Sequence, residues 1–128
     1  MIDHVAIFVP KGQLETIADW YKVALRPLQY REIMRRPGAV GLGYEGVELW
    51  ITECEDTSAP KAHVSLRAPD HAAVNEFHNA AVAADGVCNG APGFRPEYNE
   101  SYYASFVLDP LGNNIEVVDQ CSHEEEYR

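Results

Sequence analysis

Residues 4–10 read HVAIFVP and residues 63–69 read HVSLRAP, so one short segment occurs twice, 59 residues apart. Both copies carry a histidine, a valine, a small residue, an aliphatic residue and a final proline at matching positions. The alternation of side chains in each copy predicts a half-buried β-strand. Because an internal repeat constrains architecture more firmly than local propensity does, the sequence predicts two related modules.

A helix and three further strands are expected after each copy. Apolar residues recur at helical spacing over residues 14–25 and 74–84. Asp70 is the expected N-cap of the second helix, and Gly86 is its expected C-terminal stop. The strands are predicted from residue composition and alternation at 28–34, 39–44 and 46–51 in the first module and at 87–91, 102–108 and 114–119 in the second.

The predicted fold class is α+β, with two tandem β-α-β-β-β modules at residues 1–58 and 61–121. A chain of 128 residues with 46% hydrophobic content can bury one core but is short for two independent domains, so one domain over residues 1–128 is expected. Residues 109–112 read DPLG, which predicts a turn and therefore a hairpin between the last two strands.

The charge of the chain limits its partners. A formal net charge of −10, from 20 acidic and 10 basic side chains, repels nucleic acid and anionic membrane surfaces. The sequence begins without a basic leader or a long apolar segment, so we expect a cytoplasmic protein. The three cysteines include no Cys-x-x-Cys pair, which indicates reduced, structural thiols.

The alternation of side chains places four potential metal ligands on one kind of sheet face. In each of four predicted strands, the face opposite the aliphatic residues carries one histidine or glutamate. A single strand histidine is more often structural, but the repeat favours joint ligation. Imidazoles and carboxylates suit a divalent transition metal, which would also neutralise the acidic pair. The four residues are His4, Glu48, His63 and Glu116.

The segments IDHVA at 2–6, AHV at 62–64 and LDPLGNNIE at 108–116 resemble the vicinal oxygen chelate superfamily. This superfamily contains glyoxalase I, extradiol dioxygenases and the fosfomycin and bleomycin resistance proteins. The resemblance implies paired modules whose mixed sheets curl into a cup around a divalent metal ion, which could be Ni, Zn, Fe, Mn or Co. It also implies that His4, His63 and Glu116 form the common ligand set, with Glu48 as the fourth ligand of glyoxalase I-like members.

The leading functional interpretation is a metal-dependent lyase or isomerase that resembles lactoylglutathione lyase and acts on a small molecule. The metal would chelate two neighbouring substrate oxygens and stabilise an enediolate, while Glu48 or Glu116 transfers a proton. Phe8 stands where bacterial glyoxalase I-like proteins carry an arginine that contacts glutathione, so the use of glutathione stays open. Arg67 holds the equivalent place in the second module.

Two other functions remain open at this stage. One is an Fe(II) extradiol-type dioxygenase, and the other is a drug-binding resistance protein without catalysis. Substrate contacts are expected from Arg67, which could grip an anionic group, and from the aromatic residues Phe8, Trp50 and Tyr103, although ordinary core positions also carry such residues. Residues 90–99 are either a lid or a surface loop. The resemblance also implies a homodimer, with each site formed within one chain or shared between two.

Overall fold

The computed structural model describes residues 2–56 and 61–121. The expected module boundary near residues 57–60 and the tail from residue 122 lie outside these described residues. No helix in the described part is long and apolar enough to cross a membrane.

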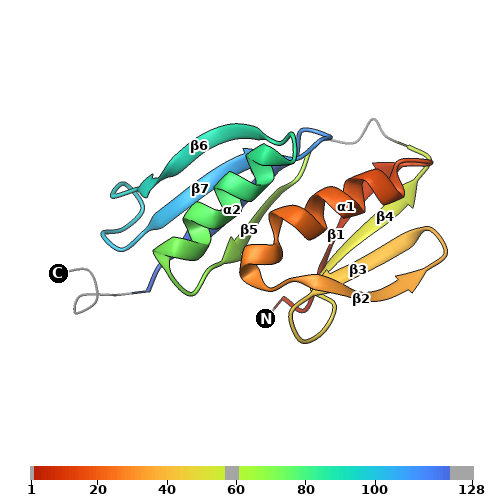
Figure 1. Ribbon diagram of the computed structural model, residues 1–128, viewed down its shortest axis with the longest axis horizontal. Helices are drawn as coiled ribbons and strands as arrows, with labels where there is room; N and C mark the ends of the chain where they lie inside the picture. Colours follow the sequence, from red (N-terminus) through yellow and green to blue (C-terminus); the bar gives the residue numbers. More distant parts are fainter. Residues whose placement is uncertain (1, 57–60, 122–128) are drawn as a thin grey trace.

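The first module contains one α-helix, one 3-10 helix and a four-stranded sheet (Figure 1). Its sheet has the strand order β1-β4-β3-β2, in which β1 and β4 are parallel and the other pairs are antiparallel. The elements in chain order are β1 (Val5–Pro10), α1 (Leu14–Ala24), η1 (Arg26–Leu28), β2 (Arg31–Arg36), β3 (Ala39–Gly43) and β4 (Leu49–Cys54).

The second module repeats this topology. Its sheet has the order β5-β8-β7-β6, again with one parallel pair, β5 and β8. The predicted α+β fold with two β-α-β-β-β modules is therefore confirmed, although the two mixed sheets are separate rather than closed into one barrel. The elements are β5 (His63–Arg67), α2 (His71–Ala83), β6 (Val87–Phe94), β7 (Tyr103–Leu108) and β8 (Asn114–Asp119).

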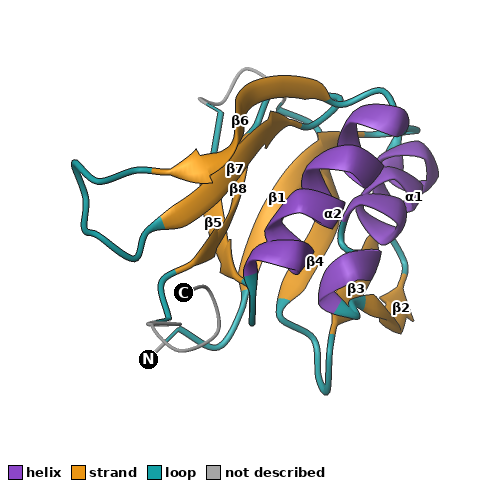
Figure 2. Ribbon diagram, turned by 60° about the vertical axis from the view of Figure 1, so that its left-hand side comes forward, coloured by secondary structure: helices purple, strands orange, loops and turns teal. Residues whose placement is uncertain are grey.

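The two modules meet through their helices. Helix α1 packs on its own sheet and against α2, and Figure 2 shows both helices on the same side of the molecule. One apolar core joins Ile17 and Tyr21 of α1 to Phe77 and Ala81 of α2, and all four are essentially inaccessible to solvent. Each sheet therefore has a helix side and an opposite side, which we call its open face.

The predicted alternation along the first strand of each module is confirmed. Ile7 and Val9 of β1 are buried on the helix side, whereas Phe8 is exposed. In β5, Val64 packs against the core, while His63 is exposed. Phe8 and His63 thus lie on the open faces of their sheets.

A buried carboxylate joins the β7–β8 turn to the first module. Asp109 is 3% exposed and accepts a hydrogen bond from the Tyr21 hydroxyl of α1 at 2.5 Å. It also accepts hydrogen bonds from the backbone N–H groups of Leu111 and Asn113 and from the Asn113 side chain. The Asn113 side-chain oxygen in turn accepts from the Ala62 N–H at 2.8 Å. The predicted turn is present, with the Gly112 N–H donating to the Asp109 carbonyl.

Three local predictions need correction. The strand expected from residue 28 begins only at β2, because Leu28 belongs to η1 and Gln29 then adopts a left-handed conformation. The loop expected over residues 90–99 is a strand as far as Phe94, because β6 accommodates its irregular sequence with register shifts around Gly90.

The third correction concerns the end of α2. Asp70 caps the start of this helix as predicted, accepting from the Ala73 N–H. At the other end, the left-handed residue is Asp85, not Gly86. Gly86 is required for a different reason: a Cβ atom there would lie 2.7 Å from the Ala81 carbonyl oxygen and 2.8 Å from the Trp20 ring.

Tyr21→Phe should lower the free energy of unfolding by about 1–3 kcal/mol, because it leaves one oxygen of the buried Asp109 without its hydroxyl donor. Urea denaturation followed by circular dichroism measures this change. Tyr98→Phe is the matched control, since Tyr98 is 65% exposed, and should change stability by less than about 0.5 kcal/mol. Equal stability of the two variants would show that the Tyr21–Asp109 contact does not hold the modules together.

Candidate functional site

In the second module, His63 and Glu116 lie in direct contact. His63 begins β5 and Glu116 lies in the neighbouring strand β8. The His63 Nε2 atom is 3.2 Å from Glu116 Oε1, and the His63 Nδ1 atom is 2.9 Å from the Asn114 carbonyl oxygen. The carboxylate is almost fully buried, whereas half of the histidine side chain is exposed. We call His63 and Glu116 the second half-site.

The Asn114 carbonyl determines what the His63 ring can do. A carbonyl oxygen only accepts, so Nδ1 carries the proton of this contact. In a neutral ring Nε2 then has a free lone pair, and this atom faces the Glu116 carboxylate. Two groups with lone pairs at this distance repel each other unless a proton or a cation lies between them. Histidine ligands of metals are commonly held in this way by an acceptor on the second ring nitrogen.

Tyr102, a residue that the sequence analysis did not select, covers Glu116. It lies directly before β7, and its hydroxyl donates to Glu116 Oε2. Burial and the neighbouring Glu116 carboxylate raise the pKa of Tyr102 to about 12. The hydroxyl therefore stays protonated at neutral pH and holds one oxygen of Glu116, which leaves Oε1 toward His63.

In the first module, His4 and Glu48 occupy neighbouring positions before β1 and β4. The Val5 N–H donates to the Glu48 carbonyl at 3.0 Å, which places the two chain segments side by side. The exposed His4 ring has its Nδ1 atom 2.7 Å from the Asp3 carboxylate, so its Nε2 atom is again the one left for a ligand. We call His4 and Glu48 the first half-site.

Glu48 is held by a tyrosine as Glu116 is. The Tyr30 hydroxyl donates to Glu48 Oε2 at 2.7 Å, and the Tyr44 N–H donates to Oε1 at 3.3 Å. Burial and the adjacent Glu48 carboxylate raise the pKa of Tyr30. Each candidate carboxylate thus has one oxygen occupied by a protonated phenol.

The two glutamates do not occupy equivalent positions in the two modules. Val5 pairs with Leu49 in the first module, and the equivalent Val64 pairs with Ile115 in the second. The residue equivalent to Glu48 is therefore Asn114, and the residue equivalent to Glu116 is Trp50. The histidines match, but the glutamates are displaced by two positions. Glu116 lies on the open face of its sheet, as His63 does, whereas Glu48 precedes β4 and its carboxylate is bound by Tyr30, which packs against the core.

The structure brings the side chains of His63 and Glu116 into contact, whereas His4 and Glu48 are neighbours through their backbone segments. Within residues 2–56 and 61–121, no three His, Cys, Asp or Glu side chains gather closely enough to hold a metal ion. His63 and Glu116 lie on the open face of their sheet, whereas His4 and Glu48 directly precede the strands β1 and β4. The residues of each half-site fit a cation, and neither half-site completes a ligand set by itself.

Three of the expected substrate-binding residues lie on the open faces or at their edge. Phe8 is 59% exposed in β1, and Arg67 is exposed at the end of β5. Trp50 of β4 is partly buried, with the Arg36 guanidinium 5.8 Å above its ring. These side chains flank the first and second half-sites along their own strands.

The expected position of Tyr103 is wrong. Its ring stacks on His71 at the start of α2, and its hydroxyl donates to Asn75 of the same helix at 2.8 Å. Tyr103 shares the helix side of β7 with the buried Val107, because residues four apart in a strand point the same way. The neighbouring Tyr102 is the tyrosine that reaches a half-site.

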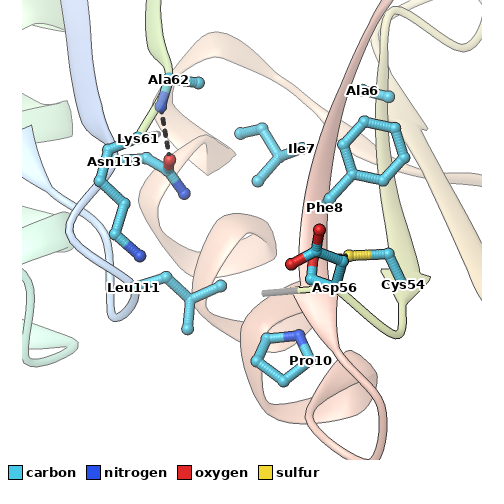
Figure 3. Close-up of a pocket in the computed structure, with 10 residues that line it drawn as sticks. All are labelled: Ala6, Ile7, Phe8, Pro10, Cys54, Asp56, Lys61, Ala62, Leu111 and Asn113. Atoms are coloured by element: carbon cyan, nitrogen blue, oxygen red, sulfur yellow. Dashed lines mark hydrogen bonds between the residues drawn. The ribbon is translucent and has the colours of Figure 1, made fainter. Parts of the chain in front are cut away.

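A small cavity of about 100 Å³ lies between the modules, apart from both half-sites (Figure 3). Phe8 and Cys54 line one side, and Lys61 and Asn113 line the other. None of the four candidate ligands lines it. This cavity lies between the end of β1 and the β7–β8 turn.

Comparison with known proteins adds to this picture at the level of structure. No family model and no curated protein matches the sequence. Solved structures do match: a glyoxalase/bleomycin resistance protein from Albidiferax ferrireducens T118 is 20% identical with a TM-score of 0.73, over 91% of this chain and 97% of that chain.

Two other solved structures are similar. A glyoxalase/bleomycin resistance protein/dioxygenase family enzyme from Burkholderia phytofirmans PsJN is 19% identical with a TM-score of 0.72, over 94% of this chain and 98% of that one. Lactoylglutathione lyase from Agrobacterium tumefaciens is 16% identical with a TM-score of 0.62, over 90% and 91% of the two chains. The likeness at these identities concerns the fold, and this chain has the fold of the glyoxalase/bleomycin resistance/dioxygenase proteins, the vicinal oxygen chelate superfamily.

Proposed function

We propose that the protein is a metal-dependent enzyme of the glyoxalase-like type, a lyase or isomerase that acts on a small molecule. The observation that carries this proposal is the matching state of the two repeated histidines. His4 and His63 each have Nδ1 beside an oxygen acceptor, and each keeps Nε2 for a ligand. Structural histidines do not require this arrangement twice, whereas metal ligands commonly have it.

The proposed ligands are His4, Glu48, His63 and Glu116, and the cation is divalent. Its positive charge would stabilise negative charge that develops on two neighbouring substrate oxygens. The close approach of His63 Nε2 to Glu116 Oε1 is compatible with this assignment, because a cation between the two atoms, like a proton, removes the repulsion between their lone pairs. The nitrogen and oxygen ligand set is compatible with Ni, Zn, Fe, Mn or Co.

Glu48 or Glu116 is the proposed group that removes and returns a substrate proton. Each carboxylate has one oxygen bound by a tyrosine hydroxyl, which fixes the orientation of the group. The second oxygen of each carboxylate is not the one that the phenol holds. Tyr30 and Tyr102 therefore act as positioning residues for the proposed bases.

We propose further that two chains form the working unit. The half-sites belong to separate sheets, and no group of three potential ligands exists within the described part of one chain. In a symmetric dimer, the first half-site of one chain can face the second half-site of the other, which produces two complete sites.

The substrate is proposed to be a small cytoplasmic metabolite with an anionic group. Arg67 at the end of β5 offers a guanidinium for that group, and Phe8 and Trp50 offer apolar contacts on the other sheet. Phe8 supplies no charge, so glutathione is not part of the proposal.

The displaced glutamates favour a second candidate, an Fe(II) extradiol-type dioxygenase. Because Glu48 and Glu116 do not occupy equivalent positions, this candidate leaves Glu48 out of the ligand set. The remaining ligands, His4, His63 and Glu116, are the two-histidine, one-carboxylate arrangement of oxygen-activating iron sites. Oxygen uptake by Fe(II)-loaded protein with catechols would support this candidate. Proton exchange of an α-hydroxycarbonyl compound by Ni(II)- or Zn(II)-loaded protein would support the first.

His63→Ala should abolish binding of Ni(II) and Zn(II) while the protein keeps a cooperative thermal transition, since His63 is half exposed and contributes little to the core. Isothermal titration calorimetry and elemental analysis measure the metal. His78→Gln is the control for loss of a histidine outside the half-sites and should retain full metal content. A His63→Ala protein that keeps its metal, or that does not fold, would favour a structural role for His63.

Mixing inactive chains tests whether a site is shared. If sites span two chains, co-expressed His4→Ala and His63→Ala chains should recover roughly a quarter of the wild-type metal content, because half of the dimers are mixed and each has one intact site. Sites confined to one chain predict no recovery, since neither chain has both histidines. A monomer by light scattering would contradict the shared site directly.

Tyr102→Phe tests the contact that orients Glu116. Folded Tyr102 keeps its proton up to about pH 12, whereas an ordinary tyrosine loses it near 10. The contact therefore stabilises the fold fully below pH 10, and this contribution is lost as the pH rises toward 12. In a titration with base, the variant should show a smaller increase in phenolate absorbance near pH 12, where Tyr102 loses its proton in the wild-type protein. A loss confined to the part near pH 10 would show that Tyr102 does not donate to Glu116.

A further inference from the structure

His78 and Cys88 form a second polar contact between chemically reactive side chains, away from both half-sites. His78 lies on α2 and Cys88 lies on β6, the edge strand of the second sheet. The His78 Nε2 atom is 3.2 Å from the Cys88 Sγ atom. All three cysteines were expected to be structural thiols, so the sequence did not predict this pair.

The fold places this pair on the helix side of the sheet. Cys88 pairs across the strands with Val107, which is fully buried beneath α2. Paired residues of adjacent strands point to the same face, so the Cys88 side chain points toward α2, where His78 meets it. His63 and Glu116 lie on the opposite face. Chemistry at Cys88 is therefore independent of the proposed metal site.

The state of the two side chains suits proton transfer between them. Partial burial lowers the pKa of His78, so its ring is neutral at neutral pH and one ring nitrogen can accept a proton. The thiolate, not the thiol, is the nucleophilic form of cysteine, and an adjacent imidazole is a common base for generating it. Cys88 is also exposed, so a small reagent can reach the sulfur.

The other two cysteines differ from Cys88. The Cys54 thiol is partly buried and donates to the Asp56 carbonyl oxygen at 2.9 Å, which holds its proton in place. Cys121 is exposed, and its backbone N–H donates to Asp119. In the described part of the chain, the Cys88 thiol is the one in contact with an imidazole.

We propose that Cys88, with His78 as its base, is a modification site at which the protein exchanges with small disulfides such as oxidised glutathione. His78 Nε2 accepts the thiol proton, and Cys88 Sγ attacks one sulfur of the disulfide. The bond between the two reagent sulfurs breaks as the new S–S bond forms, and the departing thiolate takes the proton from His78. One thiol and one disulfide thus yield one mixed disulfide and one free thiol, with no other oxidant.

The experiment compares reaction rates in single-cysteine chains. Chains that carry Cys54→Ser and Cys121→Ser retain Cys88, with or without His78→Gln, and release of the coloured thiol from 5,5′-dithiobis(2-nitrobenzoate) measures the rate. His78→Gln should slow the reaction about tenfold, a modest share of what a positioned base contributes in enzymes. Asn79→Gln, on the next and exposed position of α2, should leave the rate unchanged.

Wild-type protein treated with oxidised glutathione should carry the glutathionyl group on Cys88 first, as mapped by peptide mass spectrometry. Modification of Cys54 or Cys121 ahead of Cys88 would overturn the proposal. The proposal would also be overturned if the single-cysteine chain with His78→Gln reacted within about twofold of the rate of the chain that retains His78, with both chains shown to be folded by thermal unfolding. Because metal content is measured separately, failure here leaves the proposed metal site untouched, and the reverse also holds.

Discussion

The buried Asp109 carboxylate is the constraint on which the arrangement of the two modules depends. It lies in the β7–β8 turn of the second module, yet one of its donors is Tyr21 in the helix of the first. A buried carboxylate is costly unless every oxygen has a partner, and here four hydrogen bonds satisfy it. The raised pKa of Tyr21, caused by burial and by Asp109, keeps the phenol a donor. The turn and α1 therefore fold as one unit.

This constraint has a consequence for the candidate site. Because the helices of both modules pack together on one side, the two open faces are left for other contacts. Each module carries one histidine with an occupied Nδ1 atom and one glutamate with an oxygen held by a tyrosine. The fold thus prepares two similar half-sites without joining them, and assembly of a complete site becomes a property of the proposed dimer rather than of one chain.

Much of the fold could be predicted from the sequence because the repeat and the alternation of side chains are local signals. The positions of Ile7, Phe8 and Val9 follow from alternation alone, and Asp70 caps its helix as its type and place suggest. Tyr102 could have been found by the same count, since it stands one residue from Tyr103 and must point to the other face. The oxygen acceptor of the His63 ring could not have been found in this way, because it is a backbone carbonyl, which no side-chain pattern reveals.

The register of the parallel strands was the other feature that could not be predicted from the sequence. Strands β1 and β4 are separated by a helix and two strands, so nothing local sets which of their residues face each other. Glu48 and Glu116 have similar aliphatic neighbours in the sequence. The register of β1 with β4 nevertheless places Glu48 two residues away from the position that Glu116 has in the pairing of β5 with β8. A shift of two preserves the face of a side chain and changes only its height along the strand. Alternation therefore predicts which side chains share a face, whereas the relative heights of Glu48 and Glu116 could not be predicted.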